Sequence, residues 1–314
     1  MKRADIGIAV AGATDAARAA ADIVLTEEGL GTIIHGILIA RAIFQRINNF
    51  ITYRIAATLQ LLIFFFISIF AFTPMDFTQP DDPDRGLEWP EFFHMPVIML
   101  MLITLLNDGT LISIAYDNAE PSQTPNKWNL TCLFTVSSEL GMVACLSSLL
   151  LLWFMLDSWN PDGFFAKLGV EGMQYGQIIT AIYLKVSVSD FLTLFSARTG
   201  DRFFWQIRPA MPLFCGACLA LFLSSILALF WPDSEIEGIL VQGLKSNQFV
   251  FWFVWIYSIV FFLIQDTLKV GLLKWMQKVN FAGISQTGVV VLPESALQLI
   301  KDLETNLKAE GVTH

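Results

Sequence analysis

Six long apolar segments constrain this chain more than any other feature of its sequence. Each has about 20 mainly apolar residues, the length a helix needs to cross the roughly 30 Å hydrocarbon core of a bilayer. They predict a mainly α, polytopic membrane protein with six transmembrane helices, and they exclude a soluble globular domain. The predicted spans are residues 51–72, 95–116, 131–156, 174–197, 210–232 and 249–272.

The composition supports a membrane protein. Of the 314 residues, 55% are hydrophobic and only 15% are charged, whereas about 25% is typical of soluble domains. The net charge of −9 argues against a nucleic-acid partner, because such binding needs basic surface to displace counterions. Cys215 and Cys218 form a lone CxxC pair, and because tetrahedral zinc needs four ligands we expect no metal site.

The charged residues between the spans predict the orientation. Lysine and arginine near span ends are retained in the cytoplasm. The loops after the first, third and fifth spans hold twelve acidic residues but only Arg85, Lys167 and Lys245 as basic ones. We therefore expect those loops outside and both termini in the cytoplasm. Asn129 begins a glycosylation sequon that would then stay unmodified.

Residues 1–34 have the pattern of a soluble α/β segment. Residues 6–10 and 22–26 are short β-type runs, and the alanine-rich stretch between them predicts a helix with Thr14 as its N-cap. So short a segment cannot close a core of its own. We interpret it as the edge of a larger α/β domain.

The segments that flank the spans have different characters. Residues 35–50 contain no proline and predict a stalk helix that continues into the first span. Residues 273–314 are polar and amphipathic, and we expect a cytoplasmic tail in which Pro293 opens a helix. That helix could pack on its own protein, regulate it or form oligomers.

Asp108 is the strongest candidate transport residue. A charged side chain at a span centre costs about 2.5–3.5 kcal/mol by insertion scales, so its presence requires a local reason. Asp108 lies near the middle of the second span, beside Asn107 and before Gly109. Glycine permits local distortion, and a carboxyl removed from water can bind a proton. The structural alternative is a carboxyl that hydrogen-bonds to a neighbouring helix.

Two further pairs of charges lie in the spans. Asp190 is a secondary site candidate in the fourth span, and Lys185 lies five residues before it. Because five residues turn a helix by about 500°, the two side chains point about 140° apart and should not pair. Asp266 and Lys269 are three residues apart and should form a structural ion pair.

Three more polar residues lie within the first and third spans. Arg54 enters the first span at its cytoplasmic end and should act as a snorkelling anchor. Gln60 lies deeper in the same span, where an amide is expected to hydrogen-bond across helices. Glu139 in the third span has no clear assignment.

Several stretches of the sequence resemble a known family. Residues 4–26 resemble the end of the phosphorylation domain of a P-type ATPase, and the similarity extends to about Lys278. Three further motifs resemble the plasma-membrane proton pumps of plants, fungi and protists. They are RAIFQR at residues 41–46, NDGT at 107–110 and AYDNA at 115–119.

The resemblance implies an ATP-driven proton exporter of the plasma membrane. The six spans would be the fifth to tenth membrane helices of a ten-helix pump, and Asp108 matches the family's proton-binding carboxylate. Gln60 stands where plant pumps have an arginine and fungal pumps a histidine, and Asp190 stands where fungal pumps have a glutamate. The implied partners are protons, the lipid bilayer and the rest of the pump; a homo-oligomer is left open.

The chain also departs from the family's pattern. The phosphorylated aspartate in DKTGT, the TGE loop, the nucleotide domain, the first four membrane helices and the magnesium-binding GDGVND segment do not occur in it. We therefore expect a carboxyl-terminal fragment that does not hydrolyse ATP alone. ATP and Mg²⁺ would serve the complete pump, and this fragment should bind neither.

Two other functions stay open at this stage. A calcium or sodium pump gathers several carboxylates around its ion, whereas this chain has one central aspartate beside one asparagine. A non-catalytic membrane subunit or pseudo-pump is the second alternative. An open reading frame that continues upstream of Met1 into GDGVND would exclude it.

Overall fold

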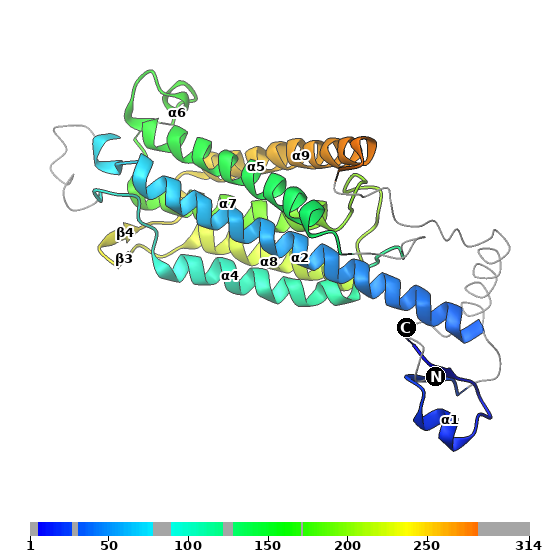
Figure 1. Ribbon diagram of the computed structural model, residues 1–314. Helices are drawn as coiled ribbons and strands as arrows, with labels where there is room; N and C mark the ends of the chain where they lie inside the picture. The colour runs from blue at the N-terminus through cyan, green and yellow to red at the C-terminus, as the bar shows by residue number, and fades with distance from the viewer. Residues whose placement is uncertain (1–5, 27–30, 78–88, 122–127, 171, 282–314) are drawn as a thin grey trace. The chain divides into compact units, whose positions relative to one another are not determined.

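The computed structural model of the chain describes residues 6–26, 31–77, 89–121, 128–170 and 172–281 (Figure 1). The chain divides into two compact units. The first unit comprises Met1–Gln45, Ala119–Lys127 and Thr287–His314, and the second comprises Arg46–Asn118 and Trp128–Gln286.

The first unit contains a small parallel β–α–β element. Strands β1 (Ile8–Ala9) and β2 (Ile23–Val24) pair in parallel, and helix α1 (Asp15–Ala19) connects them. The side chain of Thr14 accepts a hydrogen bond from the Ala17 amide at 3.4 Å, so the predicted N-cap is present. The order of strand, helix and strand is the one that the sequence predicted.

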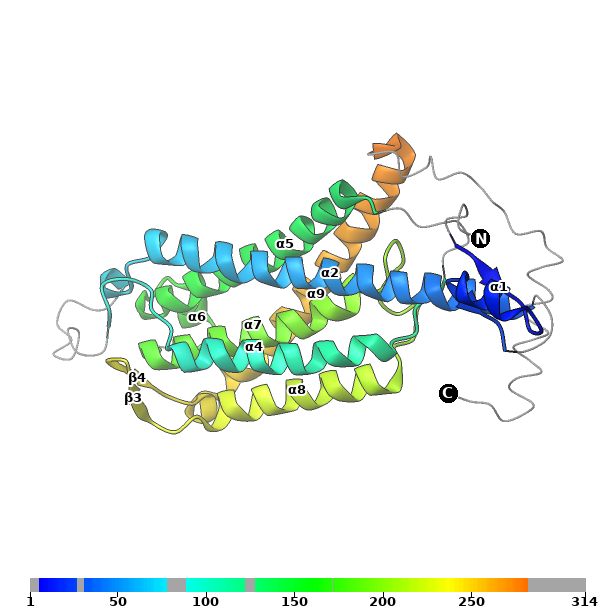
Figure 2. The same ribbon diagram turned by 60° about the horizontal axis from the view of Figure 1, so that its bottom comes forward.

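Six long apolar helices account for most of the described residues (Figures 1 and 2). Each is long and apolar enough to cross a membrane, α4 together with the 3₁₀ turn that continues it to Tyr116, which confirms the predicted fold class. They are α2 (Gly31–Ala71), α4 (Val97–Ile112), α5 (Leu130–Leu156), α7 (Tyr175–Ala197), α8 (Met211–Phe230) and α9 (Gln248–Val279). Short helical segments lie between them: α6 (Phe164–Lys167) and the 3₁₀ turns Pro74–Phe77, Ser113–Tyr116, Asp157–Trp159 and Leu244–Ser246.

The helix ends differ from the predicted spans mainly at two places. The predicted stalk and first span form one continuous helix, α2, of 41 residues. Helix α9 continues to Val279 rather than ending at residue 272, so part of the predicted tail is helical. It stops at Asn280, whose φ of 53° lies in the left-handed region. The helix predicted from Pro293 lies outside the described residues.

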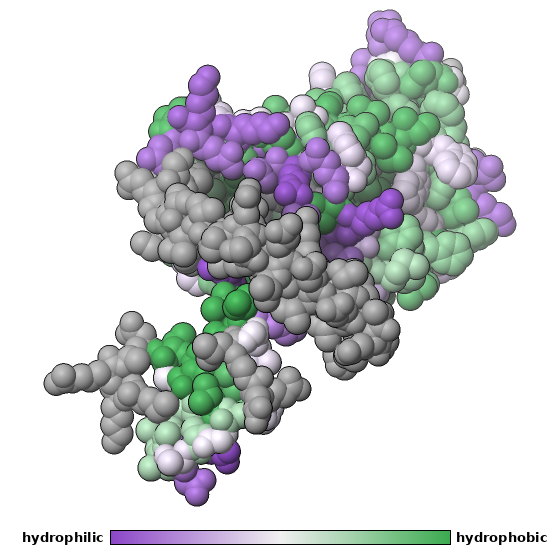
Figure 3. All heavy atoms as spheres, turned by 90° about the vertical axis from the view of Figure 1, so that its right-hand side faces the viewer, coloured by the Kyte–Doolittle hydropathy of each residue, from purple (hydrophilic) through white to green (hydrophobic). Residues whose placement is uncertain are grey.

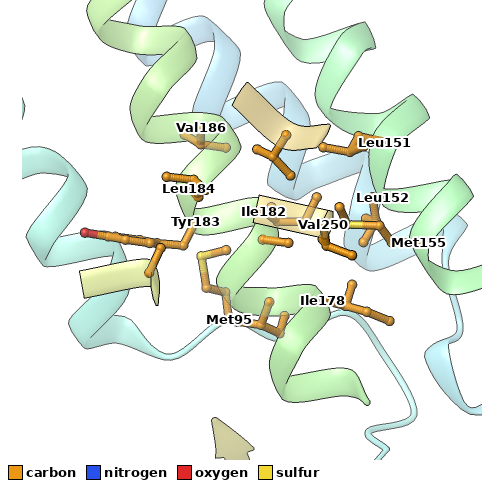
Figure 4. Packing of buried hydrophobic residues seen from close by; sticks show 14 of the residues in the cluster. Met95, Leu151, Leu152, Met155, Ile178, Ile182, Tyr183, Leu184, Val186 and Val250 are labelled. Carbon is orange, nitrogen blue, oxygen red and sulfur yellow. The ribbon is translucent and has the colours of Figure 1, made fainter. Parts of the chain in front are cut away.

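Helix α7 lies at the centre of the second unit. It packs against α4, α5, α8 and α9. In its most apolar 18-residue stretch 83% of the residues are buried, whereas the corresponding share for α4 is 33%. Ile178 and Ile182 of α7 meet Leu152 and Met155 of α5 in the main hydrophobic cluster (Figure 4). A helix that is buried all round is typical of the core of a large bundle.

The outer sides of the helices are apolar. Large side chains point outward from several helices, including Phe70, Phe222 and Trp252. Figure 3 shows hydrophilic residues gathered over one end of the bundle and hydrophobic residues along its flank. Helices with such flanks suit a lipid environment, and the chain is an integral, multi-pass membrane protein.

A β-hairpin connects α8 and α9. Strands β3 (Ser234–Ile236) and β4 (Ile239–Val241) pair antiparallel. Strand β4 packs against α7, where a Cβ atom on Gly176 would collide with the carbonyl oxygen of Leu240. The hydroxyl of Thr180 also donates to the carbonyl oxygen of Gln242 at 2.8 Å. The hairpin is therefore fixed on the central helix.

Candidate functional site

Asp108 faces outward from α4 and forms an ion pair with Arg54 of α2. The Nη1 atom of Arg54 lies 2.5 Å from Oδ1 of Asp108, and the two side chains are 46% and 55% exposed. Among the described residues Asp108 lines a groove along α4, and its predicted removal from water stays a prediction. Asp108 shares this face of α4 with Leu105, which is 68% exposed. The interpretation of Arg54 as a simple anchor missed this contact.

Asn107 points to the opposite side of α4, into the bundle. It is buried, and its Nδ2 donates to Oδ2 of Asp190 on α7 at 3.1 Å. The Tyr53 hydroxyl of α2 donates to Oδ1 of the same amide. Because consecutive helical residues are about 100° apart, Asp108 lines the groove while the preceding residue connects three helices.

Asp190 and Gln60 are both about 1% exposed. Oδ1 of Asp190 and Nε2 of Gln60 have no hydrogen-bond partner in the described part of the chain. The predicted hydrogen bond from Gln60 across helices is therefore wrong for its amide nitrogen. The structure brings Asp190 and Asn107 together, but it shows no hydrogen bond from Gln60 to either within the described residues.

Lys185 is fully buried and bonds to α5. Its Nζ donates to the carbonyl oxygen of Ala144 at 2.8 Å and to the hydroxyls of Ser147 and Ser148 at 2.6 and 2.5 Å. The amine is thus directed to α5 and not to Asp190, as the helical spacing predicted. The sequence analysis did not identify Ser147 and Ser148 as the partners of Lys185. Two adjacent serines within an apolar span were the pattern that could have indicated them.

Two buried ion pairs stabilise one end of the helices. Lys269 Nζ lies 2.9 Å from Oδ1 of Asp266, and both side chains are 1% exposed, which confirms the predicted pair. The Arg198 guanidinium forms two hydrogen bonds to the Asp117 carboxylate, at 2.6 and 2.9 Å. Sequence reasoning missed the second pair, although Asp117 lies in the AYDNA motif.

The remaining candidates form no metal centre in the described residues. Both carboxylate oxygens of the half-buried Glu139 lack a hydrogen-bond partner there. Cys215 and Cys218 are free and exposed. No group of three or more histidine, cysteine, aspartate or glutamate side chains that could hold a metal occurs in the parts of the chain that the structure describes.

Comparison with known proteins relates this chain to proton ATPases. Over 280 residues, or 86% of the chain, it is 49% identical to "Probable proton ATPase 1B" of Leishmania donovani. "Probable proton ATPase 1A" of the same organism matches with the same identity over the same length. The chain spans 28% of the length of each relative. Comparison with models of protein families finds no match. The similarity supports the resemblance on which the sequence analysis depends: over these 280 residues the chain is similar to a part of these proton ATPases.

Proposed function

We propose that this chain is the membrane half of an ATP-driven proton pump and that Asp108 carries the proton. The observation that supports this role is the Asp108–Arg54 pair, which lies within two apolar helices and yet opens to a groove. A carboxylate in such a position can be neutralised by a guanidinium or by a proton. Exchange between these two partners would be the transport step.

The buried network of Tyr53, Asn107 and Asp190 would couple the helices during this exchange. Asn107 precedes Asp108 on α4 and is joined to α2 and α7 through hydrogen bonds. A shift of α2 would therefore move both Arg54 and the Asn107 amide. Asp190 and Gln60 are proposed as supporting residues of the same site.

Each segment of the chain has a place in the proposed pump. Residues 1–34 would be the edge of the cytoplasmic phosphorylation domain, 35–50 the stalk, 51–272 the membrane domain and 273–314 the cytoplasmic tail. The continuous helix α2 would transmit conformational change from the stalk to Arg54. Both termini would lie in the cytoplasm, and the membrane would be the plasma membrane.

ATP and Mg²⁺ enter the proposal only through the remaining part of the pump. The described residues offer no cluster of metal ligands, and no proton-transfer step proposed for this chain uses a bound nucleotide. Phosphoryl transfer would supply the energy that moves α2. A calcium or sodium pump is not favoured, because the relatives are named as proton ATPases.

The proposal can be tested in a chimera in which this chain replaces the matching segment of the Leishmania proton ATPase 1B. ATP-driven acidification of sealed vesicles measures transport. We expect Asp108→Asn to lower the rate at least about 100-fold, because an amide cannot carry the proton. Asp108→Glu is the matched control and should retain part of the activity. Normal transport by the asparagine variant would contradict the proposal.

A further inference from the structure

A groove of about 650 Å³ connects Asp108 with a second carboxylate, Glu237. Glu237 lies on the turn between β3 and β4, at the start of α4, and Asp108 lies eleven residues along that helix. At about 1.5 Å per residue, the path between them is about 16 Å long. Along one face of α4 it passes Met101 and Thr104, at helical spacings of three and four residues.

The fold places Glu237 at the groove mouth at a conformational cost. Glu237 and Gly238 form the two-residue turn and have φ values of 53° and 79°. The left-handed region suits glycine but disfavours glutamate. A hairpin fixed on α7 and contacts from the side chain must therefore hold the residue in place.

The Glu237 carboxylate makes those contacts to the segment that enters α4. Its oxygens accept hydrogen bonds from the Val97 amide at 3.3 and 3.4 Å, and Oε2 lies 3.1 Å from Nε2 of His94. The Tyr175 hydroxyl donates to the His94 carbonyl oxygen at 2.8 Å and fixes that segment to α7. The side chain is still 38% exposed, so it reaches both the groove and the solvent.

The titratable groups around Glu237 come from three elements. His94 and Glu91 lie on the segment before α4, Asp108 lies on α4, and Glu235 lies on β3. Of these titratable groups, His94 is the one that hydrogen-bonds to the Glu237 carboxylate. A carboxylate beside an imidazole in partial contact with water can accept and pass on a proton at the mouth of the groove.

We propose that Glu237 is the outer proton acceptor of the transport path, and that the α4 groove leads the proton from Asp108 to it. The proposal rests on the proposed function. The proton would leave the Asp108 carboxyl, pass along water in the groove to the Glu237 carboxylate and then enter the external solvent. Arg54 would then pair again with the ionised Asp108, so that charge balances at both ends.

The test uses the chimeric pump in sealed vesicles whose lumen faces the outer end of the groove. Glu237→Gln keeps an oxygen that can accept from the Val97 amide but removes the ionisable group. We expect its initial transport rate to fall about tenfold with a neutral lumen, and we expect the rate to depend less on lumenal pH than in the parent. Glu237→Asp should restore part of the rate and of the pH profile.

Glu235→Gln is the matched control, because Glu235 is exposed on the same hairpin and does not line the groove. It should keep the parent's rate and pH profile. A Glu237→Gln pump with both properties unchanged would overturn the inference. Equal losses in the Gln and Asp variants would overturn it too, since they would show a structural role only. Neither result would affect the Asp108 test, which depends on a fall in transport of at least about 100-fold for Asp108→Asn.

Discussion

The ion pairs of this protein fall into two groups that differ in their surroundings. The Asp117 carboxylate accepts from the Arg198 side chain and from the Ala210 amide, and its side chain is 3% exposed. The Asp108 carboxylate has Arg54 as its ion-pair partner and is 55% exposed beside a groove. A carboxylate with several buried donors is held in place by them, whereas one with a single exposed partner can exchange that partner. The difference separates an acid that holds the bundle together from one that is free to change its partner, as the proposed role of Asp108 requires.

The largest expected effect on stability comes from breaking the buried pair. Asp117→Asn leaves the Arg198 guanidinium buried without a counter-charge, which costs about 3–5 kcal/mol of folding free energy. Thermal unfolding of the purified protein in detergent measures the loss. The double variant Asp117→Leu with Arg198→Met should recover much of it, because no charge then stays buried. Loss of stability no larger than that of a surface substitution would contradict the assignment.

The two buried lysines differ in the charge of their partners. Lys269→Met leaves the Asp266 carboxylate buried with neutral donors only, at a cost of about 3 kcal/mol. Lys185→Met leaves only hydroxyl and carbonyl acceptors, and the serine hydroxyls can turn to other partners, so we expect about 1–2 kcal/mol. The order of the two unfolding temperatures is the measurement. A larger loss of stability for Lys185→Met would contradict this order. It would mean that the hydroxyl and carbonyl partners of Lys185 contribute more to stability than the ion pair of Lys269 does.

The Arg54–Asp108 pair should contribute less to stability than the buried pairs and more to transport. Arg54→Gln should lower the free energy of unfolding by less than Asp117→Asn does, because the released Asp108 carboxylate lies beside a groove and can take up a proton there. It should nevertheless slow ATP-driven transport by the chimeric pump about tenfold, because the released Asp108 carboxylate would lack its cation. Arg54→Lys keeps the charge and should retain more activity. Strong destabilisation with unchanged transport would place Arg54 with the structural group.

Local sequence patterns were sufficient for the helices and for short-range contacts. Apolar runs predicted all six long helices, because each span must satisfy its own backbone hydrogen bonds. The Asp266–Lys269 pair and the Thr14 cap followed from spacings of three residues. Both depend only on helix geometry.

Contacts between distant segments could not be obtained in the same way. Arg54 and Asp108 are 54 positions apart, and Asp117 and Arg198 are 81. Their pairing depends on how the helices rotate and pack, which no local period encodes. The same reason explains why Glu237, on a turn outside the spans, was not recognised.

The central claim is that the Asp108 carboxyl is protonated in one state of the pump and ionised in another. Infrared difference spectroscopy of the chimeric pump, before and after ATP addition, can detect that change directly. We predict a protonated-carboxyl band that appears in one state, disappears in the other and is absent from the Asp108→Asn variant. A difference spectrum that is identical in the parent and the variant would contradict the account.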